Sequence, residues 1–80
     1  MTIAFNESWV PQRAVAVTPS DTTVITATAI YVGTGGNVVV NDNNGNATTF
    51  VGVPGGTTLW IKATRVRATG TTASNIVALS

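Results

Sequence analysis

Apolar residues recur at every second position in several short runs of this 80-residue chain, and Gly, Pro, Asn and Asp separate the runs. Apolar residues at every second position are typical of strands, because successive side chains of a strand point to opposite faces of a sheet. The β-branched residues Val, Ile and Thr, which favour strands, are abundant. No window holds apolar residues at helical spacing for more than about one turn. The pattern therefore predicts an all-β protein.

Recognisable turn sequences separate the expected strands. Pro19-Ser20-Asp21 predicts a turn, and the stretch 42–46 with its Asn-Gly pair predicts a tight hairpin. Strands are expected over residues 13–18, 24–32, 37–41, 48–53, 57–68 and 75–79. Six to seven short strands at this spacing indicate a small antiparallel β-sandwich or barrel. The sequence leaves open whether the strands follow a Greek key or a meander.

The expected strand over residues 57–68 has an inconsistent hydrophobic phase. Its first apolar residues fall on one face, whereas its last ones fall on the other: Leu59, Ile61 and Ala63 against Val66 and Ala68. A β-bulge near residues 63–65 would return both sets to the core. The alternative is a strand buried on both faces, with Trp60 and Val66 packing against a partner. The bulge is the favoured interpretation.

The first twelve residues do not alternate cleanly and differ from the rest of the chain. Pro11 cannot donate to a β-ladder, and it restricts the preceding residue to extended conformations. We therefore expect an N-terminal arm over residues 1–12 and a single β domain over 13–80. Ile3, Phe5 and Trp9 would expose apolar surface on a free arm, so the arm should dock. Docking on its own domain and docking on an adjacent subunit or scaffold both remain open.

The composition offers little for catalysis. The chain has no His and no Cys, and its carboxylates are limited to Glu7, Asp21 and Asp42. Serine or cysteine nucleophiles activated by His, and zinc sites of Cys and His, are therefore excluded. The stretch 42–46 resembles the start of a calcium loop, but glycine at the sixth position and glutamate at the twelfth are missing. No catalytic, cofactor-binding or metal-ligating residue is predicted, and we expect that the protein is not an enzyme.

The formal net charge of +1 gives little electrostatic steering. Lys62, Arg65 and Arg67 cluster in the sequence, but four basic residues in all do not make the basic stripe of a nucleic-acid binder. We expect these three to be solvated or to meet acidic groups of an adjoining subunit. The apolar runs are too short to span a bilayer, and the N-terminus lacks a signal-peptide pattern. The expectation is a soluble protein without a membrane partner.

Small size predicts assembly. A chain of 80 residues lies at the lower end of what one core stabilises, and disulfides are impossible here. Association with copies of itself, or permanent attachment to a larger body, is the remaining common way to stabilise so small a domain.

Three stretches together resemble the head spike base proteins of tailed bacteriophages and gene-transfer agents. They are AVAVTPSDTT, AIYVGTGGNVVV and FVGVPGGTTLWIKATRVRATGTTASNIVAL, at residues 14–23, 29–40 and 50–79. The sequence departs from the family pattern at residues 41–46 and at Trp60, where a smaller residue is usual. The N-terminal arm is the part that matches least.

The resemblance implies a non-enzymatic virion structural protein on the outer surface of the capsid, made in the host cytoplasm. Its expected partners are further copies of itself, the major capsid protein and, in some members, a head fibre protein. Fivefold vertices imply a pentamer. The alternatives are a trimeric cement protein that bridges capsomers and a small module that binds cell-surface glycan through Trp60 or Trp9. The expected capsid or subunit contacts are Ile3, Phe5, Trp9 and Trp60.

Overall fold

The computed structural model describes residues 11–80. These residues form seven strands and no helix. All strand pairs are antiparallel. The strands are β1 (Ala14–Val17), β2 (Ala29–Thr34), β3 (Gly36–Asp42), β4 (Ala47–Val53), β5 (Thr57–Leu59), β6 (Ala63–Val66) and β7 (Ser74–Leu79). The prediction of an all-β protein with six to seven short strands is confirmed.

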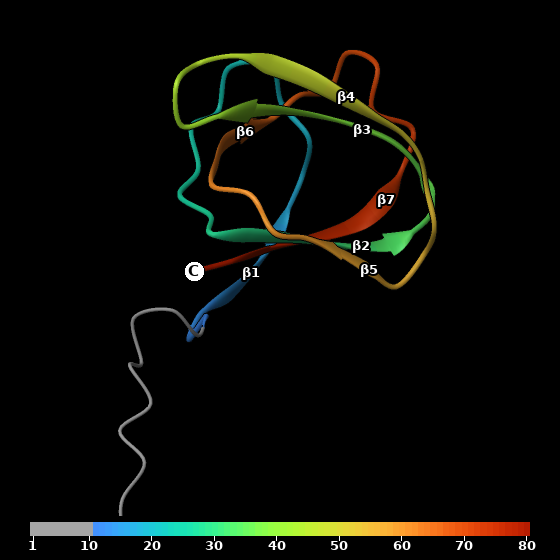
Figure 1. Cartoon of the computed structure of the whole chain (residues 1–80), viewed down its shortest axis with the longest axis horizontal. Coiled ribbons are helices and arrows are strands. Elements are labelled where there is room, and N and C mark those ends of the chain that lie inside the picture. The colour runs from blue at the N-terminus through green and yellow to red at the C-terminus, as the bar shows by residue number, and fades with distance from the viewer. Residues whose placement is uncertain (1–10) are drawn as a thin grey trace, which may run out of the picture.

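The strands form two facing sheets, the lower and upper layers of Figure 1. The lower layer, sheet A, has the order β1-β7-β2-β5, and the upper layer, sheet B, has the order β4-β3-β6. Of the pairs consecutive in sequence, only β3 and β4 are hydrogen-bonded neighbours among the described strands. The two sheets form a sandwich, and the strands do not follow a meander. Most connections cross from one sheet to the other.

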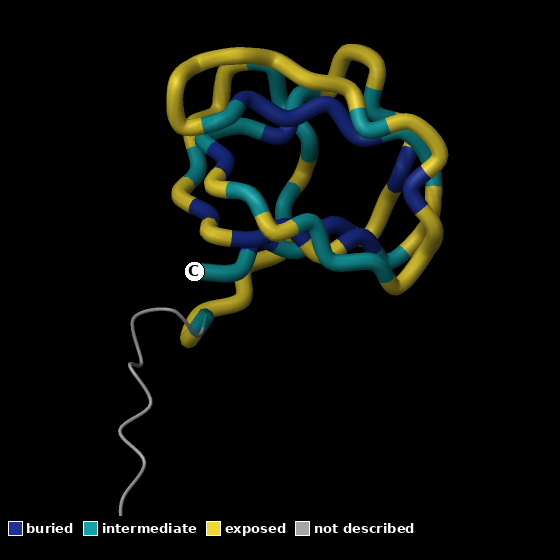
Figure 2. Tube along the Cα trace, viewed as in Figure 1, coloured by how far each residue is buried: buried dark blue, intermediate teal, exposed yellow. Residues whose placement is uncertain are grey.

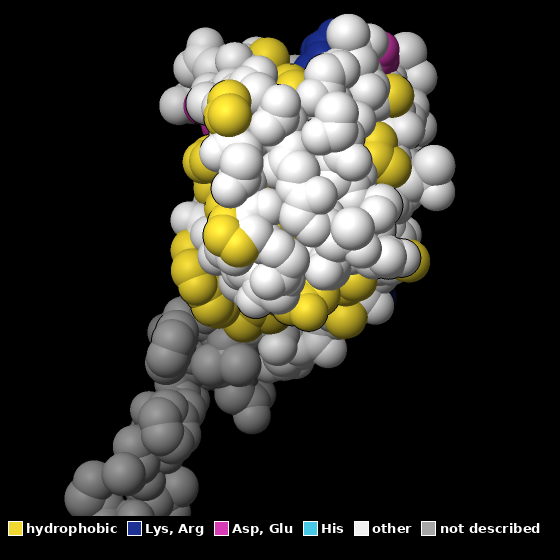
Figure 3. Space-filling view, turned by 90° about the vertical axis from the view of Figure 1, so that its right-hand side faces the viewer, with side chains coloured by type: hydrophobic (Ala, Val, Ile, Leu, Met, Phe, Trp, Pro, Cys, Tyr) yellow, Lys and Arg dark blue, Asp and Glu magenta, His cyan; other side chains and the backbone are white. Residues whose placement is uncertain are grey.

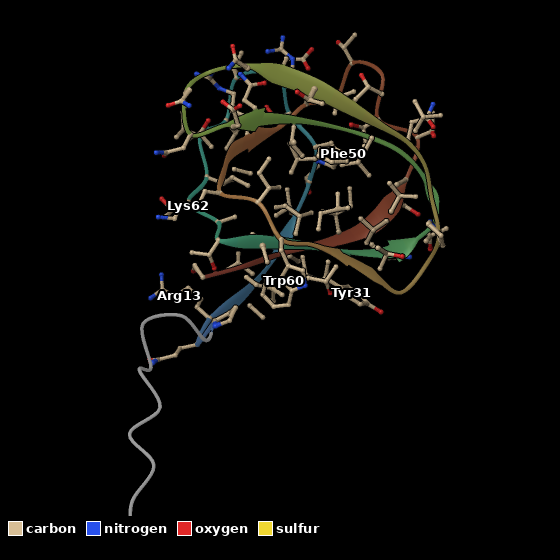
Figure 4. The ribbon with its side chains drawn as sticks, in the orientation of Figure 1. Arg13, Tyr31, Phe50, Trp60 and Lys62 are labelled. Atoms are coloured by element: carbon tan, nitrogen blue, oxygen red, sulfur yellow. The ribbon has the colours of Figure 1, made fainter. Side chains whose placement is uncertain are left out.

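The core lies between the two sheets and consists of Val, Ile and Ala side chains. Figure 2 shows that both layers contain buried residues. Alternation explains its composition, because every second residue of a strand points inward. The largest fully buried side chains come from the middle strands and β6: Ile30, Val32, Val38, Val40, Val66 and Ile76. Phe50 packs against this cluster from β4, which pairs it with Val38 (Figure 4).

The hairpin between β3 and β4 forms as the sequence predicts. One carboxylate oxygen of Asp42, Oδ1, accepts hydrogen bonds from the backbone N–H groups of Asn44 at 2.8 Å and Asn46 at 2.9 Å. Gly45 has a φ of 85°, a conformation that glycine adopts with little strain. These local bonds explain the Asp and Asn residues as turn formers.

The strand expected over residues 24–32 is wrong in its first half. Residues 20–27 run irregularly along the open edge of β6, where Ser20 and Ile25 donate backbone hydrogen bonds to Val66 and Thr64 at 2.8 and 2.7 Å. The chain joins sheet A only at Thr28, whose N–H donates to the carbonyl of Leu79 at 2.7 Å. One continuous strand is impossible here because the two halves belong to different sheets.

The strand expected over residues 57–68 is divided. Its first part is β5, which pairs with β2 in sheet A, and its last part is β6, which pairs with β3 in sheet B. The N–H of Ile61 donates to the carbonyl of Leu59 at 3.0 Å, a three-residue turn with Trp60 at its centre. The division is needed because the chain passes from one layer to the other at this turn.

The predicted bulge in the same stretch is present, but it does not bring Ala68 to the core, since Ala68 is exposed. Val40 pairs with Val66 and Asn41 with Arg65, whereas Asp42 pairs with Ala63. The strand β6 therefore contains one residue more than β3 at this point, and the inserted residue is Thr64. As a result both Ala63 and Val66 face the core, each 2% exposed.

Candidate functional site

The outward side of sheet A is apolar. Ile30, Val32, Ile76 and Ala78 face the core, so their neighbours in sequence point away from it. The cross-strand register brings these outward residues together, since Ala16 lies opposite Val77 and Tyr31 opposite Val77 and Thr58. We call this surface the apolar face, and it consists of Ala14, Ala16, Tyr31, Trp60, Val77 and Leu79.

Two aromatic residues are the most prominent members of the apolar face. Figure 4 shows Tyr31 and Trp60 on the same side of sheet A, pointing away from the interior. Trp60 is 71% exposed because it occupies the apex of the turn after β5, and Tyr31 is 37% exposed. Hydrophobic side chains also gather along the edge of the molecule where sheet A lies, and most of the remaining visible surface is uncharged (Figure 3). Exposed aromatic residues on an apolar surface are typical of interface anchors.

The sequence identified Trp60 as a contact residue but not Tyr31, Val77 or Leu79. The available signal was that the expected strands carried apolar residues on both faces. That pattern also fits a strand buried between two layers, so it could not assign one face to the outside.

The chain begins its described part beside the apolar face. The N–H groups of Gln12 and Arg13 both donate to the carbonyl of Ser80, at 2.7 and 2.6 Å, and the N–H of Ser80 donates back to Arg13 at 2.8 Å. Residue 12 is thus held against the end of β7. Ile3, Phe5 and Trp9 lie outside the described residues, and their role as contacts stays a prediction.

An open groove of about 750 Å³ lies between β1 and residues 20–26. Its apolar lining includes Val15 and Val17 of β1 together with Ile25 and Ala78. Val15 points to the inner side of sheet A yet is 50% exposed. Among the described strands sheet A has one more than sheet B, and the irregular residues 20–26 form the other side of the groove. Nothing in the sequence indicates this groove, since it arises where β1 and residues 20–26 come together in space.

The three clustered basic residues occupy different environments. Lys62 is exposed on the connection between β5 and β6, at the side of the molecule (Figure 4). The guanidinium Nε of Arg65 is buried and has no hydrogen-bond partner within residues 11–80. Arg67 is already paired, because its Nε lies 3.7 Å from Oδ1 of Asp21. A role of these residues between subunits stays a prediction.

Asp21 connects the irregular segment before β2 to the loop after β6. Its Oδ2 accepts a hydrogen bond from the Thr69 hydroxyl at 2.5 Å, and its Oδ1 accepts one from the Thr69 N–H at 3.0 Å. These two bonds, the hydroxyl bond first, hold the pKa of Asp21 below its ordinary value, and the charge of Arg67 acts in the same direction. The carboxylate therefore stabilises the folded state in its ionised form.

Asp21→Asn is expected to flatten the acid dependence of stability. A lowered pKa in the folded state means that the stabilisation is present at neutral pH and disappears as pH falls through that pKa. The wild type should therefore lose more stability between pH 7 and about pH 3 than the variant does. Thermal unfolding at the two pH values measures this, with Asp42 left intact in both proteins. An equal loss in both would contradict the assigned role.

The described residues contain no group of three or more His, Cys, Asp or Glu side chains arranged to hold a metal ion. Both described carboxylates take part in local hydrogen bonds, Asp21 with Thr69 and Asp42 with the hairpin backbone. Over residues 11–80 there is also no helix of the length and apolarity needed to cross a membrane.

Comparison with solved structures finds a related chain in a structure described as the capsid of a native GTA (gene-transfer agent) particle, computed with C5 symmetry. The two chains share 38% sequence identity and superpose with a TM-score of 0.78. The match covers 88% of this chain and 83% of the other. Comparisons with protein-family models and with curated proteins give no match.

Proposed function

Because this chain belongs to the same family as a capsid protein of the gene-transfer agent particle, we propose that it is a head spike base or decoration protein on the outer surface of a capsid. Membership at 38% identity over most of both chains makes it a virion structural protein of the phage and gene-transfer-agent type. The finer role, a small domain that assembles with copies of itself on the head, is the proposal.

The apolar face is the observation that carries this proposal. Monomeric soluble proteins rarely expose contiguous apolar patches, because such patches promote association. Here Trp60 and Tyr31 are exposed on the apolar face. The low net charge of +1 offers no repulsion against permanent neighbours. We infer that the apolar face seats the domain on the capsid shell, with the major capsid protein as its partner.

We propose a pentamer, the oligomer that the family resemblance implies and that is compatible with fivefold symmetry. The particle that contains the related chain is described with C5 symmetry. A ring of five copies is a closed assembly, in which each copy meets its neighbours through two different surfaces. A trimeric cement protein between capsomers is the alternative, and the mass of the assembled protein distinguishes the two.

Trp60→Asp is expected to reduce the amount of this protein on purified particles by about 30-fold or more, because removal of a central aromatic anchor costs at least about 2 kcal/mol of binding. The introduced carboxylate should leave the domain folded, since Trp60 is 71% exposed and lies outside the core. The measurement is the ratio of this protein to the major capsid protein in particles. Val51→Asp is the matched control, because Val51 is 77% exposed but lies on β4 of the other sheet. Full occupancy by the Trp60 variant would refute the proposed seat.

A further inference from the structure

We propose that the groove beside β1 receives residues 2–6 of a neighbouring copy, which add to sheet A as a fifth strand with Ile3 and Phe5 in the groove. This inference rests on the proposed function, because it describes how copies are joined within the assembly.

The first argument is the open edge of β1. Arg13 and Ser80 form a hydrogen-bonded pair, so the alternation of an antiparallel ladder directs the main-chain groups of Val15 and Val17 toward β7. The N–H and C=O groups of Ala14 and Ala16 therefore point the other way, and no described strand pairs with that edge. Such an edge is a template for an added strand.

The second argument is the floor of the groove. A strand added to β1 places every second side chain on the same side of the sheet as Val15 and Val17. That side is the groove, where Ile25 and Ala78 complete an apolar lining and the open volume is about 750 Å³. The volume accommodates large apolar side chains, and Val15 is left 50% exposed without them.

The third argument is the sequence that precedes β1. In residues 2–6, Thr-Ile-Ala-Phe-Asn, the two large apolar side chains are two positions apart and share one face of an extended strand. Thr2, Ala4 and Asn6 occupy the opposite face. Main-chain pairing along β1, with Ile3 and Phe5 in the groove, satisfies both the open edge and the apolar lining.

The fourth argument selects a neighbouring copy over the same chain. To fold back on its own β1 as a tight hairpin, the chain would need a turn within residues 9–12, Trp-Val-Pro-Gln, which contain none of the Gly, Asn or Asp residues that two-residue hairpin turns favour. A residue that precedes proline also favours extended conformations over those of a tight turn. The five residues 7–11 can span about 17 Å when extended, which lets residues 2–6 reach beyond their own domain.

Cross-linking of paired cysteines tests this exchange directly. The chain contains no cysteine, so introduced thiols are the only reactive ones. Ala4→Cys and Ala16→Cys in one chain place one thiol on the added strand and one on β1, both on the outer side of sheet A, and leave Ile3 and Phe5 intact. A short bifunctional maleimide should convert the assembled full-length protein into covalent multimers. The control pair Ala4→Cys with Val51→Cys, on β4, should give at least tenfold less product.

A cross-link confined to single chains would overturn the proposal in favour of an arm folded on its own domain. Absence of any cross-link, or a product only with the capsid protein in particles, would also overturn it. The proposed function would survive either result if the protein still occupied particles in a fixed ratio.

Charge substitutions give a second, independent measurement. Ile3→Asp with Phe5→Asp should lower the association of copies at least tenfold, as measured by the mass of the assembly across a dilution series. Thr2→Asp with Asn6→Asp adds the same charge on the opposite side of the strand and should have little effect. Equal effects of the two pairs would contradict insertion of Ile3 and Phe5.

Discussion

Gly36→Ala is expected to lower the free energy of unfolding by about 3 kcal/mol or more. Gly36 begins β3, directly after the chain passes from sheet A to sheet B, with a φ of 155°. A Cβ at this position would lie 2.7 Å from the backbone N of Ala73 and 2.8 Å from Oγ1 of Thr72. The Thr72 hydroxyl accepts a hydrogen bond from Asn37, so backbone and side chain would both have to move. Urea unfolding followed by circular dichroism measures the loss.

Gly45→Ala is the matched control for this substitution. Gly45 also has a positive φ, 85°, but a Cβ there would meet no atom within 4 Å. Only the conformational strain should appear, about 1 kcal/mol. If the two variants lose equal stability, the close approach at Gly36 is not what requires glycine there.

Ile30→Ala is expected to cost about 2–5 kcal/mol, since deletion of a buried aliphatic side chain removes its transfer free energy and leaves a cavity. Ile30 is fully buried in β2 and faces Leu59 on one side and Ala78 on the other. A domain of this size is stable by only about 4–12 kcal/mol. The melting temperature should therefore fall by roughly 10 °C or more.

Val51→Ala provides the comparison on the surface. Val51 is 77% exposed on β4, and its truncation should change stability by no more than about 0.5 kcal/mol. A loss below about 1 kcal/mol for Ile30→Ala would show that the interior closes around the missing atoms. Neither substitution touches the apolar face, so in a folded population occupancy of the capsid should be unchanged.

The molecule combines a well-filled core with two incompletely covered apolar surfaces. Side chains of the described residues fill the core between the sheets, as the full burial of Ile30, Val38 and Ile76 shows. The apolar face and the groove beside β1 both lie on sheet A and remain open within the described part of the chain. This division agrees with the proposed assembly, in which neighbours would cover the open apolar surfaces.

Much of the fold could be predicted from local pattern. Short runs rich in apolar and β-branched residues, bounded by turn residues, predicted β1, β3, β4 and β7 to within two residues at each end, and the Asn-Gly turn predicted the hairpin. The bulge at Thr64 followed from the conflict in phase between Ala63 and Val66. In each case the signal lay within a few neighbouring residues, where backbone geometry and side-chain direction are directly linked.

The predicted strands were wrong where one apolar run contributes residues to both sheets. The stretches around residues 24–32 and 57–68 each look like a single long strand, because both of their faces carry apolar residues. The structure divides them at Thr28 and Trp60, where the chain changes layers. Periodicity reports which residues share a face but not which sheet that face belongs to.

By itself the sequence determined the all-β class, the strand and turn chemistry, the lack of His and Cys for catalysis, and a resemblance to head spike base proteins. Only the tertiary structure decided that Tyr31, Trp60, Val77 and Leu79 form one outward surface and that Val15 and Ile25 line an open groove. The physical reason is that both surfaces arise from strands far apart in the chain. Their position depends on strand order and on the unequal number of strands in the two sheets, which long-range pairing sets and local pattern does not contain.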